Sequence, residues 1–171
     1  LVKDMLATSV IDRCYVYANL SIQYATTDTG SRFGLFCSSY NYNAYTITNC
    51  LFEGSVNSNK ATAQAIVGNY YNSTNLSNCV INADIVTTDP TMPLFARAST
   101  NCSNNYYNRD KLSLGTPVDV VGRQTGLSAL EFGMESSFTG LDFEDKWEIV
   151  SNTPVLKNNR LHNFELGLRS V

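Results

Sequence analysis

Three stretches of the chain alternate apolar and polar residues with a period of two, and each stretch follows a cysteine. The cysteines are Cys14, Cys50 and Cys79, and the apolar residues lie at even distances after them. These apolar residues are Val16, Ala18, Leu20 and Ile22, then Phe52, Gly54 and Val56, then Ile81, Ala83 and Ile85. A period of two with one apolar face predicts half-buried β-strands.

A corner of the chain is expected just before each of these strands. An apolar residue stands three places before each cysteine on the opposite parity, so the chain must bend if both side chains point inward. These residues are Ile11, Ile47 and Leu76. The residue directly before each repeated cysteine, including Cys102, is Arg13, Asn49, Asn78 or Asn101. Asparagine tolerates left-handed backbone angles and bonds nearby backbone groups, so it suits a tight corner, whereas arginine fits that role least well.

The recurrence of this unit indicates a stacked repeat. The repeated cysteines are 36, 29 and 23 residues apart, and each unit has a second apolar run, at 33–36, 65–68 and 93–96. The polar segments 23–32, 38–45, 57–64 and 86–92 are expected to be loops. Units that cannot bury their own apolar face must stack on one another. We therefore predict an all-β fold, with a right-handed parallel β-helix over residues 1–115. A β-sandwich is the alternative, but it does not explain why a corner asparagine and a cysteine recur together.

The pattern changes toward the C-terminus, where residues 116–171 are expected to form a small capping segment. Residues 125–135 predict a short amphipathic helix, with Ser128 as its N-cap and Glu131 completing a capping box. Its apolar residues are Leu127, Leu130 and Met134. An open solenoid end exposes unpaired backbone and needs a cap. Trp147 and its aromatic neighbours are expected to form the core of that cap.

The five cysteines are interpreted mainly as packing residues. Four of them take the same position of the repeat, which would place them roughly 4.8 Å apart in a buried column. A free cysteine behaves there as a small apolar side chain. A disulfide framework with one cysteine left over is the alternative, and no pair has the C-x-x-C spacing of zinc or redox sites.

Composition and charge support this interpretation and argue against two kinds of partner. Asparagine, serine, threonine and tyrosine are abundant, a mixture typical of strands and turns. The net charge of −3 argues against nucleic acid, whose binders usually have a basic patch. No apolar stretch approaches the roughly 18 residues of a membrane helix, so no membrane insertion is expected within this segment. The chain opens on Leu1 without a signal peptide, and we interpret it as part of a longer protein with neighbouring repeats.

Several motifs resemble those of bacterial surface proteins with GLUG-type repeats. They are F-E-G-S-V, A-I-V-G-N-Y, I-T-N-C, N-C-S-N-N-Y-Y-N and the closing S-F-T-G-L-D-F-E-D-K-W-E-I, within residues 10–156. The runs F-G-L-F and A-I-V-G only approximate the G-L-V-G of that family. The resemblance implies an exported, extracellular or surface-displayed, adhesin-like β-helix of bacterial origin. Some immunoglobulin-cleaving metallopeptidases carry the same repeats beside a separate catalytic domain, so the resemblance implies no catalytic residue in this segment.

The sequence offers no recognisable active site, cofactor site or metal site. A zinc protease would need H-E-x-x-H, and His162 is the only histidine. A glycosidase needs two carboxylates about 5–10 Å apart. Asp12, Glu53 and Asp84 lie at positions −2, +3 and +5 relative to the cysteines, so they do not form one row. The densest acidic cluster, 142–145, is interpreted as a solvated turn rather than a calcium loop.

Tyrosines in the variable segments are the strongest candidates for binding residues. Tyrosine combines a flat apolar ring with a polar tip, which suits sugars and protein partners. The candidates are Tyr40, Tyr42, Tyr45, Tyr70 and Tyr71, and Tyr106 and Tyr107 are also expected to be exposed. We therefore expect a non-catalytic surface segment, an adhesin or spacer that contacts host glycans or surface proteins. The alternatives are a carbohydrate-active β-helix lyase or hydrolase, or the repeat region of a larger surface metallopeptidase.

Overall fold

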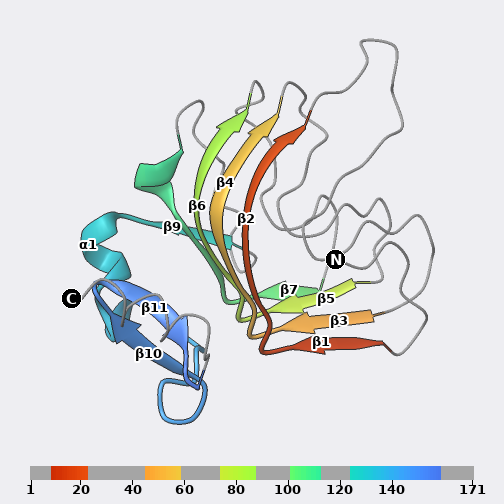
Figure 1. The fold of residues 1–171 in the computed structure, drawn as a ribbon. Helices are drawn as coiled ribbons and strands as arrows, with labels where there is room; N and C mark the ends of the chain where they lie inside the picture. Colours follow the sequence, from red (N-terminus) through yellow and green to blue (C-terminus); the bar gives the residue numbers. More distant parts are fainter. Residues whose placement is uncertain (1–8, 23–44, 59–73, 88–100, 113–123, 159–171) are drawn as a thin grey trace.

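The structure, a computed structural model, describes residues 9–22, 45–58, 74–87, 101–112 and 124–158. Most of these residues lie in two parallel sheets (Figure 1). The short sheet consists of β1 (Val10–Asp12), β3 (Tyr45–Thr48), β5 (Thr74–Ser77) and β7 (Asn101–Ser103), in that order. The long sheet consists of β2 (Tyr15–Ile22), β4 (Leu51–Ser58), β6 (Val80–Thr87), β8 (Asn105–Asn108) and β9 (Gln124–Leu127). The prediction of a predominantly β structure is confirmed.

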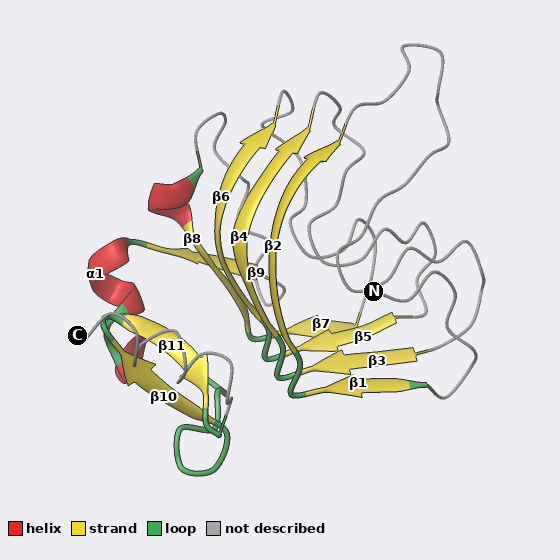
Figure 2. Ribbon diagram, in the orientation of Figure 1, coloured by secondary structure: helices red, strands yellow, loops and turns green. Residues whose placement is uncertain are grey.

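Equivalent residues of successive repeats lie opposite one another in both sheets. In the long sheet Val16 pairs with Phe52, and Phe52 pairs with Ile81. In the short sheet Ile47 pairs with Leu76. The long-sheet residues at even distances after the cysteines pack with the inward residues of the short sheet in one apolar core. The core lies in the angle between the two sheets, which diverge from a row of corners (Figure 2). The period-two pattern thus identified the buried face correctly.

The corners between the two sheets have left-handed backbone conformations. The φ angles are 52° at Arg13, 50° at Asn49, 54° at Asn78 and 54° at Asn104. The first three corners are also bonded to the next repeat, as in the hydrogen bond of 3.2 Å from the Asn49 amide to the Ser77 carbonyl. The predicted corners at Arg13, Asn49 and Asn78 are confirmed.

The fourth corner differs from the prediction, which placed it at Asn101. Asn101 lies in β7, and Cys102 is the Cα partner of Leu76 in β5. Cys102 therefore fills the apolar position two residues before the corner, and Asn105 takes the position that cysteine has in the other repeats. The better signal for the corner is an apolar residue, any residue and then asparagine, which recurs as I-T-N, L-S-N and C-S-N.

One glycine is required by its neighbours in the long sheet. Gly54 has a φ of 112°, a backbone angle that residues with a side chain rarely adopt. A Cβ at this position would also overlap the carbonyl oxygen of Ala18. The partners of Gly54 in register are Ala18 and Ala83. The second repeat therefore accepts only glycine at a position where its two neighbours carry alanine.

Residues 128–158, here called the C-terminal segment, pack against the outer face of the long sheet, away from the short sheet (Figure 1). They contain α1 (Ala129–Phe132), η2 (Glu135–Ser137) and an antiparallel hairpin of β10 (Trp147–Val150) and β11 (Thr153–Leu156). The buried core of this contact comprises Leu51, Val80, Tyr106, Leu127, Phe132, Phe138, Leu141, Trp147, Val155 and Leu156.

The helix of the C-terminal segment is shorter than the sequence indicated. The capping box of Ser128 and Glu131 is present as predicted. The predicted apolar face is wrong, because Leu127 lies in β9 while Leu130 and Met134 are 72% and 42% exposed. Phe132 is the buried residue of α1 instead. A single helical turn has no room for a regular apolar stripe.

Parts of the predicted organisation lie outside the described residues. These are the second apolar runs at 33–36, 65–68 and 93–96, most of the predicted loops, and the boundary between residues 115 and 116. β9 follows that boundary and pairs in parallel with β8.

Candidate binding face

The outer face of the long sheet carries two kinds of side chain in neighbouring rows. The row at position +1 is apolar or aromatic, namely Tyr15, Leu51, Val80 and Tyr106, and the C-terminal segment packs on it. The row at position +3 is mostly polar, namely Tyr17, Glu53, Asn82 and Asn108. We call the part of the outer face formed by positions +3 and +5 of β2, β4 and β6 the polar face.

A line of hydrogen bonds runs along the +3 row and ends on a carboxylate. Asn108 Nδ2 donates to Asn82 Oδ1 over 3.1 Å, and Asn82 Nδ2 donates to Glu53 Oε1 over 3.0 Å. The Tyr15 hydroxyl donates to Glu53 Oε2 from the neighbouring strand, also over 3.0 Å. Asn82 and Asn108 are only 6% and 7% exposed. Donors on two sides therefore hold the Glu53 carboxylate in one orientation.

The short helix η1 (Arg109–Lys111) connects this line of hydrogen bonds to the C-terminal segment. Asn108 Oδ1 accepts from the Asp110 amide over 3.1 Å, and the Asp110 carboxylate accepts from the Ala129 amide over 2.7 Å. Lys111 Nζ donates to the Asn82 carbonyl over 3.3 Å. In α1, the Ser128 amide lowers the pKa of Glu131 by donating to its carboxylate. The +3 row is thus fixed at one end by packed secondary structure.

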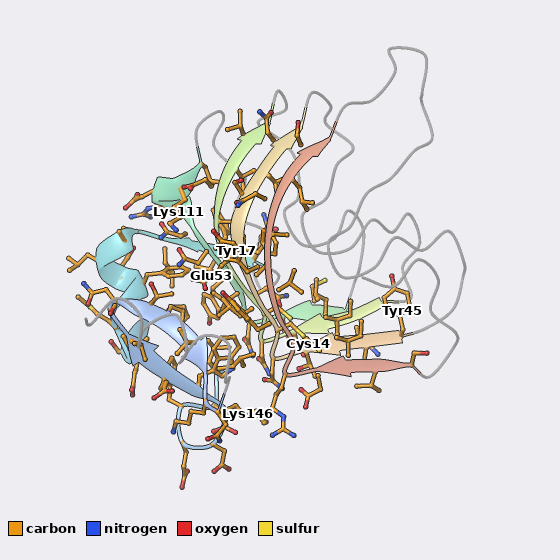
Figure 3. The ribbon with its side chains drawn as sticks, in the orientation of Figure 1. Cys14, Tyr17, Tyr45, Glu53, Lys111 and Lys146 are labelled. Atoms are coloured by element: carbon orange, nitrogen blue, oxygen red, sulfur yellow. The ribbon has the colours of Figure 1, made fainter. Side chains whose placement is uncertain are left out.

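At its other end, the +3 row reaches solvent beside Tyr17. Tyr17 is 57% exposed on the edge strand β2, and its Cα partner on β4 is Glu53. Figure 3 places Tyr17 and Glu53 close together on the long sheet, with Lys111 nearer to α1. In the +5 row, Ser55 Oγ donates to Asn19 Oδ1 over 2.9 Å, and Asp84 is exposed. Within each row, the Tyr17 ring and the Glu53 carboxylate, or the Asn19 amide and the Ser55 hydroxyl, therefore stand on strands about one spacing apart, roughly 4.8 Å.

The structure corrects the predicted exposure of three tyrosines. Tyr45 begins β3 and is 1% exposed, because it shares the inward parity of Ile47 in the core (Figure 3). Tyr106 and Tyr107 are 5% and 3% exposed. The Tyr106 hydroxyl donates to the Thr139 carbonyl over 2.6 Å, and burial raises the pKa of Tyr106. The candidates Tyr40, Tyr42, Tyr70 and Tyr71 lie outside the described residues.

The sequence contained a signal for the polar face, but only in combination with the register. Tyr17 and Glu53 are both at position +3, although in different repeats, 36 residues apart. Only the pairing of β2 with β4 makes them neighbours. Composition and local pattern therefore favour the tyrosine-rich segments, rather than this pair, as the predicted binding site.

The expected column of four cysteines contains only three, one from each of the first three repeats. Cys14, Cys50 and Cys79 are free thiols at equivalent positions, and Cys50 and Cys79 are fully buried. The thiol of Cys79 donates to the Ser77 carbonyl over 3.3 Å, and that of Cys50 donates to the Thr48 carbonyl over 3.2 Å. Burial raises the pKa of Cys79 well above its ordinary value, which opposes a nucleophilic role. Cys102 is also a free thiol, but it lies outside this column, and Cys37 lies outside the described residues.

The acidic residues named from the sequence are dispersed. Asp12 accepts a hydrogen bond of 2.8 Å from Asn49 Nδ2 at a corner, whereas Glu53 and Asp84 share the polar face. Within the described part of the chain, no group of three or more His, Cys, Asp or Glu side chains has an arrangement that could hold a metal ion.

The acidic turn of the C-terminal segment is closed by its own side chains and lysines. Asp142 Oδ1 accepts from the Asp145 amide over 2.9 Å, which lowers the pKa of Asp142, and Asp142 also pairs with Lys146 over 3.4 Å. Lys157 Nζ donates to the carbonyls of Phe143 and Glu144 over 2.8 and 2.6 Å.

Comparisons with known proteins return no match among family models, curated proteins or solved structures. The resemblance to GLUG-repeat surface proteins therefore stays a prediction. None of the helices in the described ranges has the length and apolar character needed to cross a bilayer.

Proposed function

We propose that the stacked repeats form a right-handed parallel β-helix. The parallel pairing of each repeat with the next supports this fold over a β-sandwich, whose strands are mostly antiparallel. Connections between parallel strands of one sheet are right-handed in nearly all proteins. In the first repeat, Ile11, Cys14 and Val16 are only partly buried, whereas their partners in the second repeat are fully buried. This difference supports a neighbouring repeat of a longer chain as a further partner.

We propose that this segment acts as a non-catalytic, adhesin-like module of a secreted or cell-surface protein, and that it contacts glycans or host proteins. The observation that carries the proposal is the pair of Tyr17 and Glu53, an exposed ring beside an immobilised carboxylate. Groups held in their binding geometry lose little entropy when a ligand arrives. The resemblance to GLUG-repeat proteins supports the extracellular or cell-surface location.

A binding screen tests this function directly. The labelled segment is applied to arrays of glycans and of extracellular host proteins, beside a Tyr17→Ala variant. We expect one or more ligands that the wild-type segment retains and the variant loses. Retention of no glycan and no protein would leave the segment as a passive spacer and would contradict the proposal.

A carbohydrate-active enzyme is the second candidate, because the polar face carries two carboxylates. Glu53 is the Cα partner of Asn82, and Asp84 lies two residues further along β6. This places the Glu53 and Asp84 backbones roughly 8 Å apart, on the scale of glycosidase carboxylate pairs. Chromatography of polysaccharides incubated with the segment distinguishes the two functions. Shortened products that disappear in Glu53→Gln and Asp84→Asn variants would favour the enzyme. A metallopeptidase role would require a catalytic domain elsewhere in a parent chain.

A further inference from the structure

We propose that the polar face binds a neutral, hydroxyl-rich glycan chain, with one sugar ring on Tyr17 and its hydroxyl groups on Glu53. This inference rests on the proposed binding function and narrows it to one class of ligand. It is built from Tyr17, Asn19, Glu53, Ser55 and Asp84, which lie on the same face of three neighbouring strands.

The side chains of this face match the two surfaces of a sugar. A pyranose ring has an apolar face of C–H groups, which packs against an exposed aromatic ring such as that of Tyr17. Its rim carries hydroxyl groups, which donate to carboxylates and both donate to and accept from hydroxyl and amide groups. Glu53, Ser55 and Asn19 supply these groups within about two strand spacings of Tyr17. The face offers side-chain groups only, whereas a peptide that binds by strand addition pairs with the unpaired backbone of a sheet edge.

The charge of the face selects among glycans. Its charged side chains are the carboxylates of Glu53 and Asp84. The nearest described cation in the hydrogen-bond line, Lys111, donates to the Asn82 carbonyl, and Arg109 pairs with Glu131 over 3.3 Å. The chain as a whole carries a net charge of −3. Uronic acids, sialic acids and sulfated sugars would therefore be repelled, whereas neutral sugars would not.

The immobilised carboxylate strengthens the case for a binding role. A solvent-exposed glutamate ordinarily samples several rotamers, and fixing it on binding costs free energy. Here Tyr15 and Asn82 hold both carboxylate oxygens, and Asn108 holds Asn82 in turn. The face thus meets its ligand with the acceptor already oriented.

Calorimetric titration with two matched sets of oligosaccharides tests the inference. The first set contains linear hexamers of glucose, mannose and galactose, and the second contains hexamers of the corresponding uronic acids. We expect at least one neutral hexamer to bind and the uronic acids to bind at least about tenfold more weakly. Tyr17→Ala should weaken the neutral hexamer about tenfold or more, the equivalent of roughly 1.4 kcal/mol.

Val10→Ala is the matched control, because Val10 is 63% exposed on the edge strand of the short sheet, away from the polar face. The Val10→Ala variant should bind the neutral hexamer with the affinity of the wild-type segment. Circular dichroism should show that the Val10→Ala and Tyr17→Ala variants are both folded. Preference for the uronic acids, binding that survives Tyr17→Ala, or no binding of any hexamer would overturn the inference. If an array still shows a protein ligand, the broader binding function stands while the glycan inference fails. If neither hexamers nor proteins bind, both fail.

Discussion

The side chain of Asn105 forms hydrogen bonds with two backbone groups of the preceding repeat, at Leu76 and Cys79. Its Oδ1 accepts from the Cys79 amide over 3.1 Å, and its Nδ2 donates to the Leu76 carbonyl over 3.0 Å. Asn105 is fully buried and stands where the other repeats carry cysteine. A side-chain amide thus satisfies backbone groups at the point where the fourth repeat departs from the pattern.

Replacing Asn105 with alanine should therefore be costly. The substitution leaves a buried amide and a buried carbonyl without these partners, and each such loss costs about 1–3 kcal/mol. We expect the free energy of unfolding to fall by about 2–4 kcal/mol. Urea denaturation followed by the fluorescence of Trp147, the one tryptophan, measures it. The exposed Asn57→Ala variant serves as control, and an equal loss in both variants would contradict this role of Asn105.

The first corner should be improved by asparagine. Arg13 has a φ of 52°, a left-handed backbone conformation that costs most residues roughly 1–2 kcal/mol but costs asparagine less. The ion pair of Arg13 with Asp12 is mostly exposed and contributes little. Arg13→Asn should therefore raise the free energy of unfolding by about 1 kcal/mol, and the reverse change Asn78→Arg should lower it. A destabilised Arg13→Asn variant in urea would count against the corner argument.

Gly54 should not tolerate alanine. A Cβ there meets the Ala18 carbonyl and forces a backbone with a φ of 112° on a residue that avoids it. We expect Gly54→Ala to lower the free energy of unfolding by about 3 kcal/mol or more. The equivalent residue of the next repeat supplies the control, since Ala83→Gly should cost only about 1 kcal/mol. Similar losses in the two variants would refute the steric argument.

The stability of the fold should decline in alkaline solution. Burial raises the pKa of Cys79 above the ordinary value of 9.0, so the folded chain keeps a proton that the unfolded chain releases. This contribution is complete below pH 9.0 and is lost as the pH rises toward the pKa of the folded state. The pKa of Cys14 is raised as well, whereas the hydrogen bond with Cys79 lowers the pKa of Cys50 and offsets part of the effect. Cys79→Ala should therefore reduce the alkaline slope without abolishing it. Urea midpoints measured from pH 7 to 10.5 provide the comparison, and identical slopes would speak against the buried thiol.

The sequence predicted the interior of the repeats better than their surface. Positions such as Ile47 and Phe52 repeat a strict pattern because the core admits only apolar side chains, and both were assigned correctly. Cys102 misled the assignment of the last corner because cysteine fits two apolar positions of the repeat equally well. The predicted exposure of Tyr45 is wrong because tyrosine suits both a surface and a core, and the signal for its burial is its parity with Ile47.

The candidate site was harder to predict for a physical reason. Tyr17 and Glu53 become neighbours only through the register of β2 against β4. The line of hydrogen bonds through Asn82 and Asn108 depends on side-chain orientations that no local pattern encodes. Leu130 and Met134 show the same limit, because helical spacing alone did not reveal that α1 is a single turn.

Mapping amide chemical shifts by NMR tests the central claim most directly. The isotope-labelled segment, 171 residues long, is titrated with a ligand recovered from the arrays. The largest shift changes should fall on Tyr17, Glu53 and Ser55 and should vanish in the Tyr17→Ala variant. Shift changes concentrated on the C-terminal segment or the short sheet, with the amides of β2 and β4 unmoved, would contradict a binding role for the polar face.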